Sequence, residues 1–216
     1  MTKPKYIPAL RFKWLTPLYD FLVWIRMPET KIKKCLTEYA SINKNSKVLD
    51  LGCGTGTLTI MVKEYQPEAD VTGIDIDVQI LNKAIEKAGQ KGVDIFLTDY
   101  DGSNLPFLNN KMDNIISCLV FHHLHTDKKK QILSECFRVL KKHGNLTIAD
   151  FGRSKSWMQR LLFNIIRGLD GLKSTEANAK GLLPKLVFEA GFENVLLEKR
   201  ISTLFGEVQI INAVKI

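Results

Sequence analysis

A glycine-rich turn follows a short apolar run in the first quarter of the chain, with the sequence Val48-Leu49-Asp50-Leu51-Gly52-Cys53-Gly54-Thr55-Gly56. Glycine lets the backbone take positive φ angles and come close to a ligand without a Cβ in the way. A helix that opens after such a turn supplies free backbone N–H groups. The pattern is typical of a buried strand that ends in a cofactor-binding turn.

The spacing of the glycines narrows the kind of cofactor. A dinucleotide turn is G-x-G-x-x-G, which cradles a pyrophosphate. Here the glycines are Gly52, Gly54 and Gly56, and Thr57 stands where the third glycine of that pattern would be. Asp50 precedes the turn, and a carboxylate there repels a pyrophosphate but attracts an ammonium group. The turn therefore favours a cofactor with a cationic amino-acid end.

A second acidic position ends the next apolar run, Gly73-Ile74-Asp75-Ile76-Asp77. It lies about 20 residues past the glycine turn, where an acidic residue of this architecture accepts hydrogen bonds from a ribose diol. We assign that role to Asp75, against the alternative of an ordinary acid at a strand end. Asp77 is better explained as the N-cap of the helix that follows.

The elements that must position these residues alternate short β-branched runs with amphipathic stretches, as in a parallel sheet with helical crossovers. We expect strands at 47–51, 70–74, 94–97, 114–119 and 145–150. Helices are expected within 10–42 and at 58–65, 78–88, 128–140, 157–169 and 184–190, the last ended by Gly191. Two final strands at 195–199 and 207–213 are joined by few residues and should pair antiparallel at the sheet edge.

Four segments between about Val48 and Asp150 together resemble the class I S-adenosylmethionine-dependent methyltransferases, within them most closely the ubiquinone/menaquinone-biosynthesis type and its small-molecule relatives. The segments are Asp50-x-Gly52-x-Gly54-x-Gly56, Asp75, Asp101-Gly-Ser-Asn-Leu-Pro106-Phe107 and Asp113-Asn-Ile-Ile-Ser117-x-x-x-Phe121-His122-His123-Leu124. The resemblance implies a Rossmann-like α/β fold: a seven-stranded, mostly parallel sheet with helices on both faces and an antiparallel C-terminal edge strand. Residues 1–45 would form an N-terminal helical cap on a methyltransferase domain spanning 46–216.

The resemblance also implies roles for single residues around S-adenosylmethionine. Asp50 and the backbone of Gly52, Cys53 and Gly54 would hold the methionine part, with Gly56 closing the turn. Asp75 would bind the ribose hydroxyls and Ile76 would pack on the adenine. Asp101 with Gly102 would meet the adenine edge, although Asp99 competes for that place. Ser117 and Cys118 would lie under the cofactor at the end of the fourth strand.

Methyl transfer from this cofactor is a direct displacement, so the protein mainly aligns the reactants and excludes water. An oxygen or carbon acid also needs a general base, and His122 and His123 are the candidates. The other interpretation is that these histidines pack around the cofactor. Although His125 lies close by, no acidic or cysteine partner stands at ligand spacing, so we expect no metal. Cys53 is interpreted as a small filler of the turn.

Acceptor binding falls to the segments outside the glycine turn. Arg153 follows the fifth strand, where a guanidinium could hold an anionic group. Tyr19 belongs to an aromatic, basic segment at 12–24. That segment covers the cofactor, packs on the core, or contacts a membrane surface and admits a lipid-like acceptor.

Composition limits the remaining choices. With 216 residues, 45% of them hydrophobic and 25% charged, the chain suits one globular domain. The basic start is not followed by the apolar core of a signal peptide, and the four cysteines form no disulfide pattern, so we expect a cytoplasmic location. The net charge of +8 is spread over scattered lysines, and we expect no stable nucleic-acid partner.

The expected activity is methyl transfer to a small-molecule or lipid-like acceptor. The alternatives are an RNA or protein methyltransferase, a non-catalytic protein that binds the adenosyl cofactor, and a nicotinamide oxidoreductase. The sequence determines neither the acceptor atom nor the oligomeric state.

Overall fold

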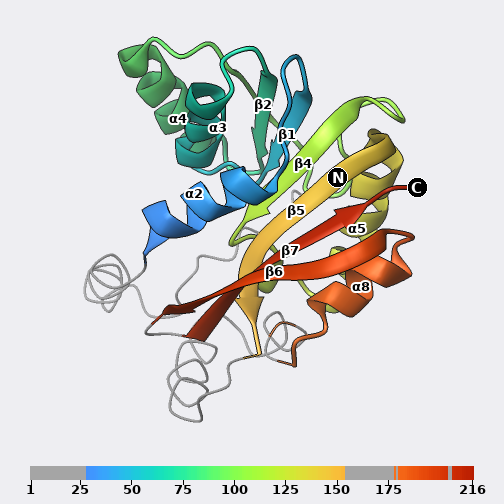
Figure 1. Cartoon of the computed structure of the whole chain (residues 1–216). Helices are drawn as coiled ribbons and strands as arrows, with labels where there is room; N and C mark the ends of the chain where they lie inside the picture. Colours follow the sequence, from blue (N-terminus) through green and yellow to red (C-terminus); the bar gives the residue numbers. More distant parts are fainter. Residues whose placement is uncertain (1–27, 154–177, 179, 204–205) are drawn as a thin grey trace, which may run out of the picture.

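Seven strands form one sheet in the order β3-β2-β1-β4-β5-β7-β6 (Figure 1). The structure is a computed structural model that describes residues 28–153, 178, 180–203 and 206–216. The strands are β1 (Lys47–Leu51), β2 (Asp70–Asp75), β3 (Phe96–Asp99), β4 (Met112–Cys118), β5 (Leu140–Gly152), β6 (Glu193–Thr203) and β7 (Gly206–Val214). The helical elements are α2 (Glu29–Tyr39), α3 (Thr57–Tyr65), α4 (Val78–Lys91), the 3₁₀ turn η1 (Phe121–His123), α5 (Thr126–Val139) and α8 (Leu183–Glu189).

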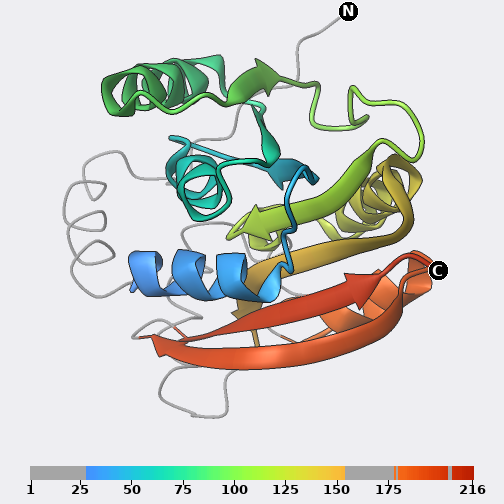
Figure 2. The ribbon, with the colours of Figure 1, turned by 45° about the horizontal axis from the view of Figure 1, so that its top comes forward.

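The direction of the strands follows the expected pattern. Strands β1 to β5 pair parallel to one another, whereas β7 pairs antiparallel with both β5 and β6. Figure 2 shows the arrow of β7 running against its two neighbours. The predicted α/β fold with an antiparallel C-terminal pair at the sheet edge is thus confirmed, and within that pair β6 is the outer strand.

Strand β1 has its predicted bounds, and the other six strands differ from theirs by one to five residues at one or both ends. The third was expected at 94–97 but runs from Phe96 to Asp99, because its residues pair in register with β2 as far as Asp75 opposite Asp99. The fifth begins at Leu140, which pairs with Met112 and so ends α5 one residue before the predicted end of the helix. The predicted helix at 157–169 and most of the region 10–42 lie outside the described residues.

The strand order has a direct consequence for ligand binding. From β1 the chain proceeds outward to β2 and β3, and it then returns to the other side of β1 to form β4 and β5. In open α/β sheets of this kind, ligands bind beyond the carboxyl ends of the strands where the order reverses. The site is therefore expected at the carboxyl ends of β1 and β4.

Helices cover both faces of the sheet and enclose two apolar cores. On one face α2 and α3 pack together; α2 buries Ile32, Cys35 and Leu36, which recur at helical spacing. On the other face α5 and α8 pack on the sheet around Ile132, Leu133 and Cys136. No helix among the described residues is long and apolar enough to span a membrane.

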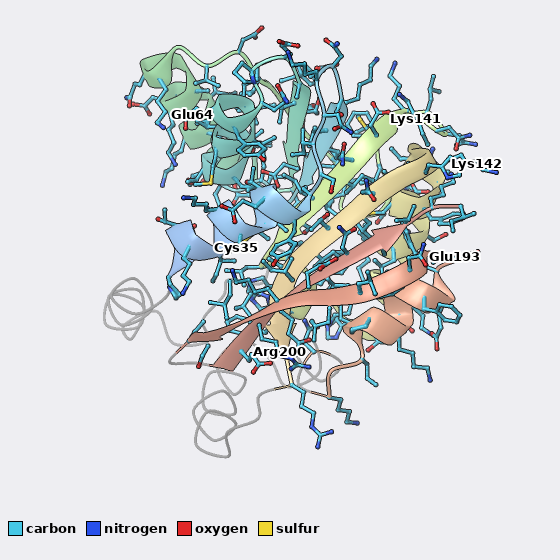
Figure 3. The ribbon with its side chains drawn as sticks, in the orientation of Figure 1. Cys35, Glu64, Lys141, Lys142, Glu193 and Arg200 are labelled. Carbon is cyan, nitrogen blue, oxygen red and sulfur yellow. The ribbon has the colours of Figure 1, made fainter. Side chains whose placement is uncertain are left out.

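The predicted caps around α4 and α8 are present. Asp77 accepts hydrogen bonds from the backbone N–H groups of Gln79 (2.9 Å) and Ile80 (3.3 Å), which caps α4 at its first turn. Gly191 follows the end of α8 with φ of 101°, a backbone conformation that favours glycine. Figure 3 shows the side chains of Lys141 and Lys142 at one end of the sheet and that of Arg200 near the other end.

Candidate active site

Asp50 is a buried carboxylate with an incomplete set of hydrogen bonds. Its side chain, 1% exposed, accepts a hydrogen bond from the Thr59 hydroxyl at 2.7 Å. Among the described residues, its Oδ1 atom has no hydrogen-bond partner. Burial raises the pKa of Asp50 to about 6, while the Thr59 hydrogen bond acts in the opposite sense. A buried acceptor without a donor is a place for a ligand that brings one.

The three glycines of the turn all have left-handed backbone conformations, with φ angles of 72°, 54° and 70° at Gly52, Gly54 and Gly56. A Cβ on Gly52 would lie 2.4 Å from Cγ2 of Val120, so the turn is packed directly against the chain that leaves β4. A Cβ on Gly54 would meet no atom within 4 Å. Gly54 is thus the position where the bare backbone faces open space.

Three backbone N–H groups of the turn already donate within the fold. The backbone N–H groups of Gly52 and Cys53 both donate to the carbonyl of Ile74 at 2.9 Å. The N–H of Gly54 donates to Oδ2 of Asp75 at 2.8 Å. A pyrophosphate needs free N–H groups at this point, whereas an ammonium group needs oxygen acceptors. The arrangement therefore fits the amino-acid end of S-adenosylmethionine better than a dinucleotide.

Asp75 and Ile76 lie together at the end of β2, as the sequence predicted. Besides binding Gly54, the Asp75 carboxylate accepts a hydrogen bond from the backbone of Asp77 at 3.1 Å. Ile76 is 60% exposed, and a Cβ on Gly102 would lie 3.2 Å from its side chain. The structure thus brings an exposed apolar side chain and the 101–104 turn beside the proposed ribose carboxylate, which suits a flat apolar base.

Asp101 and Asp99 differ in what they offer a ligand. Asp101 is exposed and accepts hydrogen bonds from the backbone of Ser103 (2.7 Å) and Asn104 (2.8 Å). These hydrogen bonds lower the pKa of the Asp101 carboxyl. Its carboxylate therefore shapes the turn, while Asp99 is exposed beside Asp75 at the ends of two paired strands. Contact of either residue with an adenine stays a prediction.

The side chains of Ser117 and Cys53 are buried and contact other parts of the protein. The fully buried Ser117 hydroxyl donates to the carbonyl of Leu51 at 3.0 Å, which ties β4 to the end of β1. Its proton is therefore committed and is not offered to a ligand. Cys53 is buried, and burial raises the pKa of its thiol. The sulfur would lie 3.0 Å from a Cβ on Gly73, which fits the predicted filling role.

His122 and His123 form most of the short turn η1, but their surroundings differ. Nδ1 of His122 lies 2.9 Å from Oδ1 of Asp150, a buried carboxylate at the end of β5. His123 is exposed, and its ring centroid lies 3.9 Å from that of His122. Loss of water around the ring and the neighbouring His122 lower the pKa of His123 to about 4.

Sequence reasoning missed three residues around this pair. Asp150 was read as the end of a strand and the start of a segment that binds the acceptor, and neither reading linked it to His122. Asn178 was read only as part of an acceptor-binding stretch at 170–178, and Lys129 only as part of a helix, because their roles depend on a contact across 28 residues and on burial.

Of the two predicted acceptor-binding residues, the structure describes only Arg153. Arg153 is exposed directly after β5, and a Cβ on Gly181 would lie 3.1 Å from its Cβ. Tyr19 lies outside the described residues. Within the described part of the chain, no group of three His, Cys, Asp or Glu side chains could hold a metal ion.

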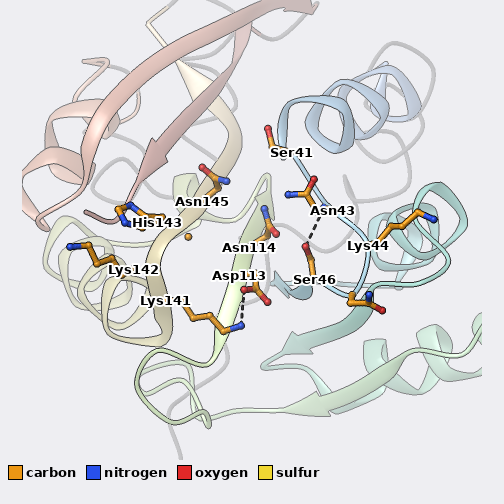
Figure 4. Close-up of a pocket in the computed structure, with 12 residues that line it drawn as sticks. Ser41, Asn43, Lys44, Ser46, Asp113, Asn114, Lys141, Lys142, His143 and Asn145 are labelled. Atoms are coloured by element: carbon orange, nitrogen blue, oxygen red, sulfur yellow. Dashed lines mark hydrogen bonds and ion pairs between the residues drawn. The ribbon is translucent and has the colours of Figure 1, made fainter.

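A polar pocket of about 360 Å³ lies at the opposite end of the sheet, where strands β1, β4 and β5 begin (Figure 4). In that pocket Lys141 pairs with Asp113 at 2.7 Å, and the Ser46 hydroxyl accepts a hydrogen bond from the backbone of Asn43 at 3.1 Å. Its charged groups are thus partly matched within the protein. The pocket lies away from the carboxyl ends of the strands, and none of the predicted site residues lines it.

Comparisons with known proteins agree with this geometry. A family model described as a methyltransferase domain matches residues 48–144. An uncharacterized methyltransferase of a Geobacillus species is 31% identical over 160 residues, which cover 71% of this chain and 73% of that protein. A demethylmenaquinone methyltransferase of Thermus thermophilus is 27% identical over 183 residues, 82% of each chain.

A solved structure shows the same fold. The magnesium protoporphyrin IX methyltransferase of Synechocystis PCC 6803, with bound SAH, matches 87% of this chain and 83% of that chain with a TM-score of 0.67 and 23% identity.

Proposed function

Because the chain belongs to the class I S-adenosylmethionine-dependent methyltransferases, we propose that it transfers a methyl group to a small-molecule or lipid-like acceptor that carries an acidic hydrogen. The observation that carries the proposal is the carboxylate-held imidazole of His122 beside the glycine turn. An amine loses its proton readily after methylation, whereas a hydroxyl or a ring carbon needs a base during the transfer. The Thermus relative's name, demethylmenaquinone methyltransferase, supplies an acceptor of that kind.

The cofactor supplies a sulfonium methyl group, and the protein's residues supply its seat. Asp50 and the backbone of the glycine turn would hold the methionine part, with its ammonium group at the Asp50 carboxylate, and Asp75 would bind the ribose diol. Ile76 and Gly102 would border the adenine, with Asp101 or Asp99 at its edge. Val120, packed on Gly52, connects this seat to the turn that holds His122. The base and the cofactor seat are therefore parts of one packed unit.

Acceptor contacts follow from the remaining predictions. We propose that Arg153 binds an anionic part of the acceptor. Tyr19, with the aromatic segment 12–24, would cover the cofactor or meet a membrane surface that admits a lipid-like acceptor. Residues 1–45 would form the cap over the domain at 46–216, with α2 as the part of that cap that packs on the sheet.

A labelled-methyl transfer assay tests the proposal directly. The protein is incubated with methyl-labelled S-adenosylmethionine and either a short-chain demethylmenaquinone reduced to its quinol or bulk unmodified RNA. We expect label in the quinone product and none in RNA. Label in RNA alone would overturn the small-molecule assignment.

Calorimetric titration checks the cofactor seat separately. S-adenosylmethionine and S-adenosylhomocysteine should bind to the wild type, and NAD should not. Asp75→Ala should weaken both adenosyl ligands. An unchanged affinity in that variant would remove Asp75 from the proposed seat.

A further inference from the structure

Asp150 is the centre of a buried polar network at the carboxyl end of β5. Its carboxylate accepts hydrogen bonds from Nδ1 of His122 at 2.9 Å and from the His122 backbone N–H at 3.3 Å. It also accepts from the backbone N–H of Phe151 at 2.7 Å. Asn178 donates through Nδ2 to Oδ1 of Asp150 at 3.1 Å and to the Phe151 carbonyl at 2.9 Å. The carboxylate is thus fixed from three sides.

The network determines which nitrogen of His122 carries the proton. An ionised carboxylate only accepts hydrogen bonds, so Nδ1 of the imidazole must be the donor in this contact. In the neutral ring the lone pair then lies on Nε2. The His122 side chain keeps 9% of its surface exposed, so the ring is held in the protein without being sealed from a reactant.

Lys129 holds the turn that carries this imidazole. The side chain is fully buried on α5, and its Nζ donates to the carbonyl of Leu124, the residue that ends η1, at 2.6 Å. Burial lowers the pKa of Lys129 to about 8, and the negative charge of Asp150 acts against that shift. Among the described residues, Asp150 from β5 contacts the His122 ring, His123 lies beside it in the same turn, and Lys129 from α5 interacts with the charge of Asp150.

His123 lacks such support in the described part of the chain. Its ring lies against His122 and is exposed. No carboxylate contact orients it there, whereas a catalytic base is usually held by a third group. The two neighbouring histidines are therefore not equivalent.

We propose that Asp150 is a positioning residue that holds His122 with its proton on Nδ1 and its lone pair on Nε2, so that His122, and not His123, accepts the proton of the methyl acceptor. The inference rests on the methyl transfer proposed above. The acceptor's O–H or C–H bond breaks and an N–H bond forms at Nε2, which leaves an imidazolium paired with the Asp150 carboxylate. The acceptor's electron pair bonds to the methyl carbon as the carbon–sulfur bond breaks, and S-adenosylhomocysteine leaves.

A double-mutant cycle tests whether Asp150 acts through His122. With reduced demethylmenaquinone as acceptor, Asp150→Asn should lower kcat about 100-fold and leave KM within about threefold. The same change made in His122→Ala should lower kcat by less than about threefold. Equal losses in both backgrounds would show that Asp150 acts independently of His122 and would overturn the proposal.

Four further variants test alternative explanations of these losses. His123→Gln should keep kcat within about threefold, whereas His122→Gln should lose it as His122→Ala does; the reverse order would assign the base to His123. Asn178→Ala should lower kcat about tenfold through the loosened carboxylate. Asp113→Asn is the control: it makes the same Asp-to-Asn change at the amino end of β4, away from the proposed site, and should change neither kcat nor affinity for the cofactor. Calorimetry with S-adenosylhomocysteine shows that each variant retains the cofactor seat.

An acceptor-free measurement separates this inference from the proposed function. Nitrogen-15 NMR of the labelled imidazoles, with S-adenosylhomocysteine present, should show neutral His122 protonated on Nδ1 in the wild type and a mixture of tautomers in Asp150→Ala. A His122 ring protonated on Nε2, or a tautomer unchanged in the variant, would overturn the positioning role. If the wild type methylates no quinol, the proposed function fails, and the spectrum still decides between these outcomes.

Discussion

Two strand ends carry buried carboxylates of very different character. Asp50 and Asp150 are both 1% exposed, and each ends or nearly ends a parallel strand. Asp50 accepts hydrogen bonds from Thr59, while its Oδ1 has no partner in the described part of the chain. Asp150 accepts from His122, Phe151 and Asn178. Among the described residues, both oxygens of Asp150 accept hydrogen bonds, whereas only one oxygen of Asp50 does.

This difference is consistent with two roles: Asp50 is suited to bind a ligand, and Asp150 is suited to position another side chain. Because nearly all buried polar groups in proteins are paired, an unpaired one marks a place where the folded chain alone is not the working state. Burial raises the pKa of Asp50 to about 6, because the Thr59 hydrogen bond and the charge of Lys33 offset only part of the cost of removing the carboxylate from water. A cationic ligand would supply that charge. Asp150 instead uses its hydrogen bonds to hold a neighbouring side chain in place.

Asp50→Asn should have the largest effect, which is a loss of cofactor affinity. Loss of the charge removes the partner of the cofactor's ammonium group, and we expect S-adenosylmethionine to bind about 100-fold more weakly by calorimetry. The same variant should unfold a few degrees higher at pH 7.5, because the wild type keeps a carboxylate ionised in a site that disfavours ionisation. An unchanged affinity would contradict the role of Asp50. Asp113→Asn serves as the matched control: it should leave the affinity unchanged and, because Asp113 pairs with Lys141 at 2.7 Å, it should not raise the unfolding temperature.

Asp150→Ala should give the opposite result. The donors on His122, Phe151 and Asn178 would be left buried without an acceptor, and we expect the free energy of unfolding to fall by about 3 kcal/mol in urea denaturation. Cofactor affinity of the folded protein should stay within about threefold. A loss of less than about 1 kcal/mol would mean that the network around Asp150 is easily replaced by water.

The two carboxylates also differ in how far the sequence predicted them. Asp50 was found because the glycine pattern is local and the preceding apolar run fixes its place at the end of β1. The same local logic placed Asp75, the Asp77 cap and the strands that carry them. The parallel direction of the central strands followed from the alternation of runs, since parallel neighbours need helical crossovers.

Asp150 could not be assigned in that way, because its role depends on tertiary contacts. His122 lies 28 residues before it and Asn178 lies 28 residues after it. Lys129 carries a charged side chain on a helix that otherwise reads as an ordinary amphipathic pattern, and only packing shows that it is fully buried. Local spacing predicted the cofactor seat better than the residues that support the proposed base.

The pH dependence of cofactor binding sharpens the contrast at Asp50. Its pKa in the folded protein is raised above the unfolded value, so its ionised form destabilises the protein as pH rises through about 6. Binding of an ammonium group requires that ionised form. We expect the Kd for S-adenosylmethionine to be lowest near pH 7, where the carboxylate is ionised and the ligand still carries its ammonium group, and to rise about tenfold per pH unit below about pH 6. In Asp50→Asn the same plot should be flat, and a flat wild-type plot would contradict the assignment.

Thr59→Val should give the smallest effect, and it tests how far the Thr59 hydrogen bond lowers the pKa of Asp50. The Thr59 hydroxyl donates to the ionised carboxylate at 2.7 Å, so its loss should raise the pKa of Asp50 further. We expect the pH at which cofactor binding weakens to move upward by less than about one unit, with about 1 kcal/mol lost in stability at neutral pH. Thr147→Val is the matched control: Thr147 is equally buried, and its hydroxyl has no partner among the described residues. That change should leave the pH midpoint in place and keep or raise stability. Equal shifts in both variants would mean that packing, rather than the hydrogen bond, sets the ionisation of Asp50.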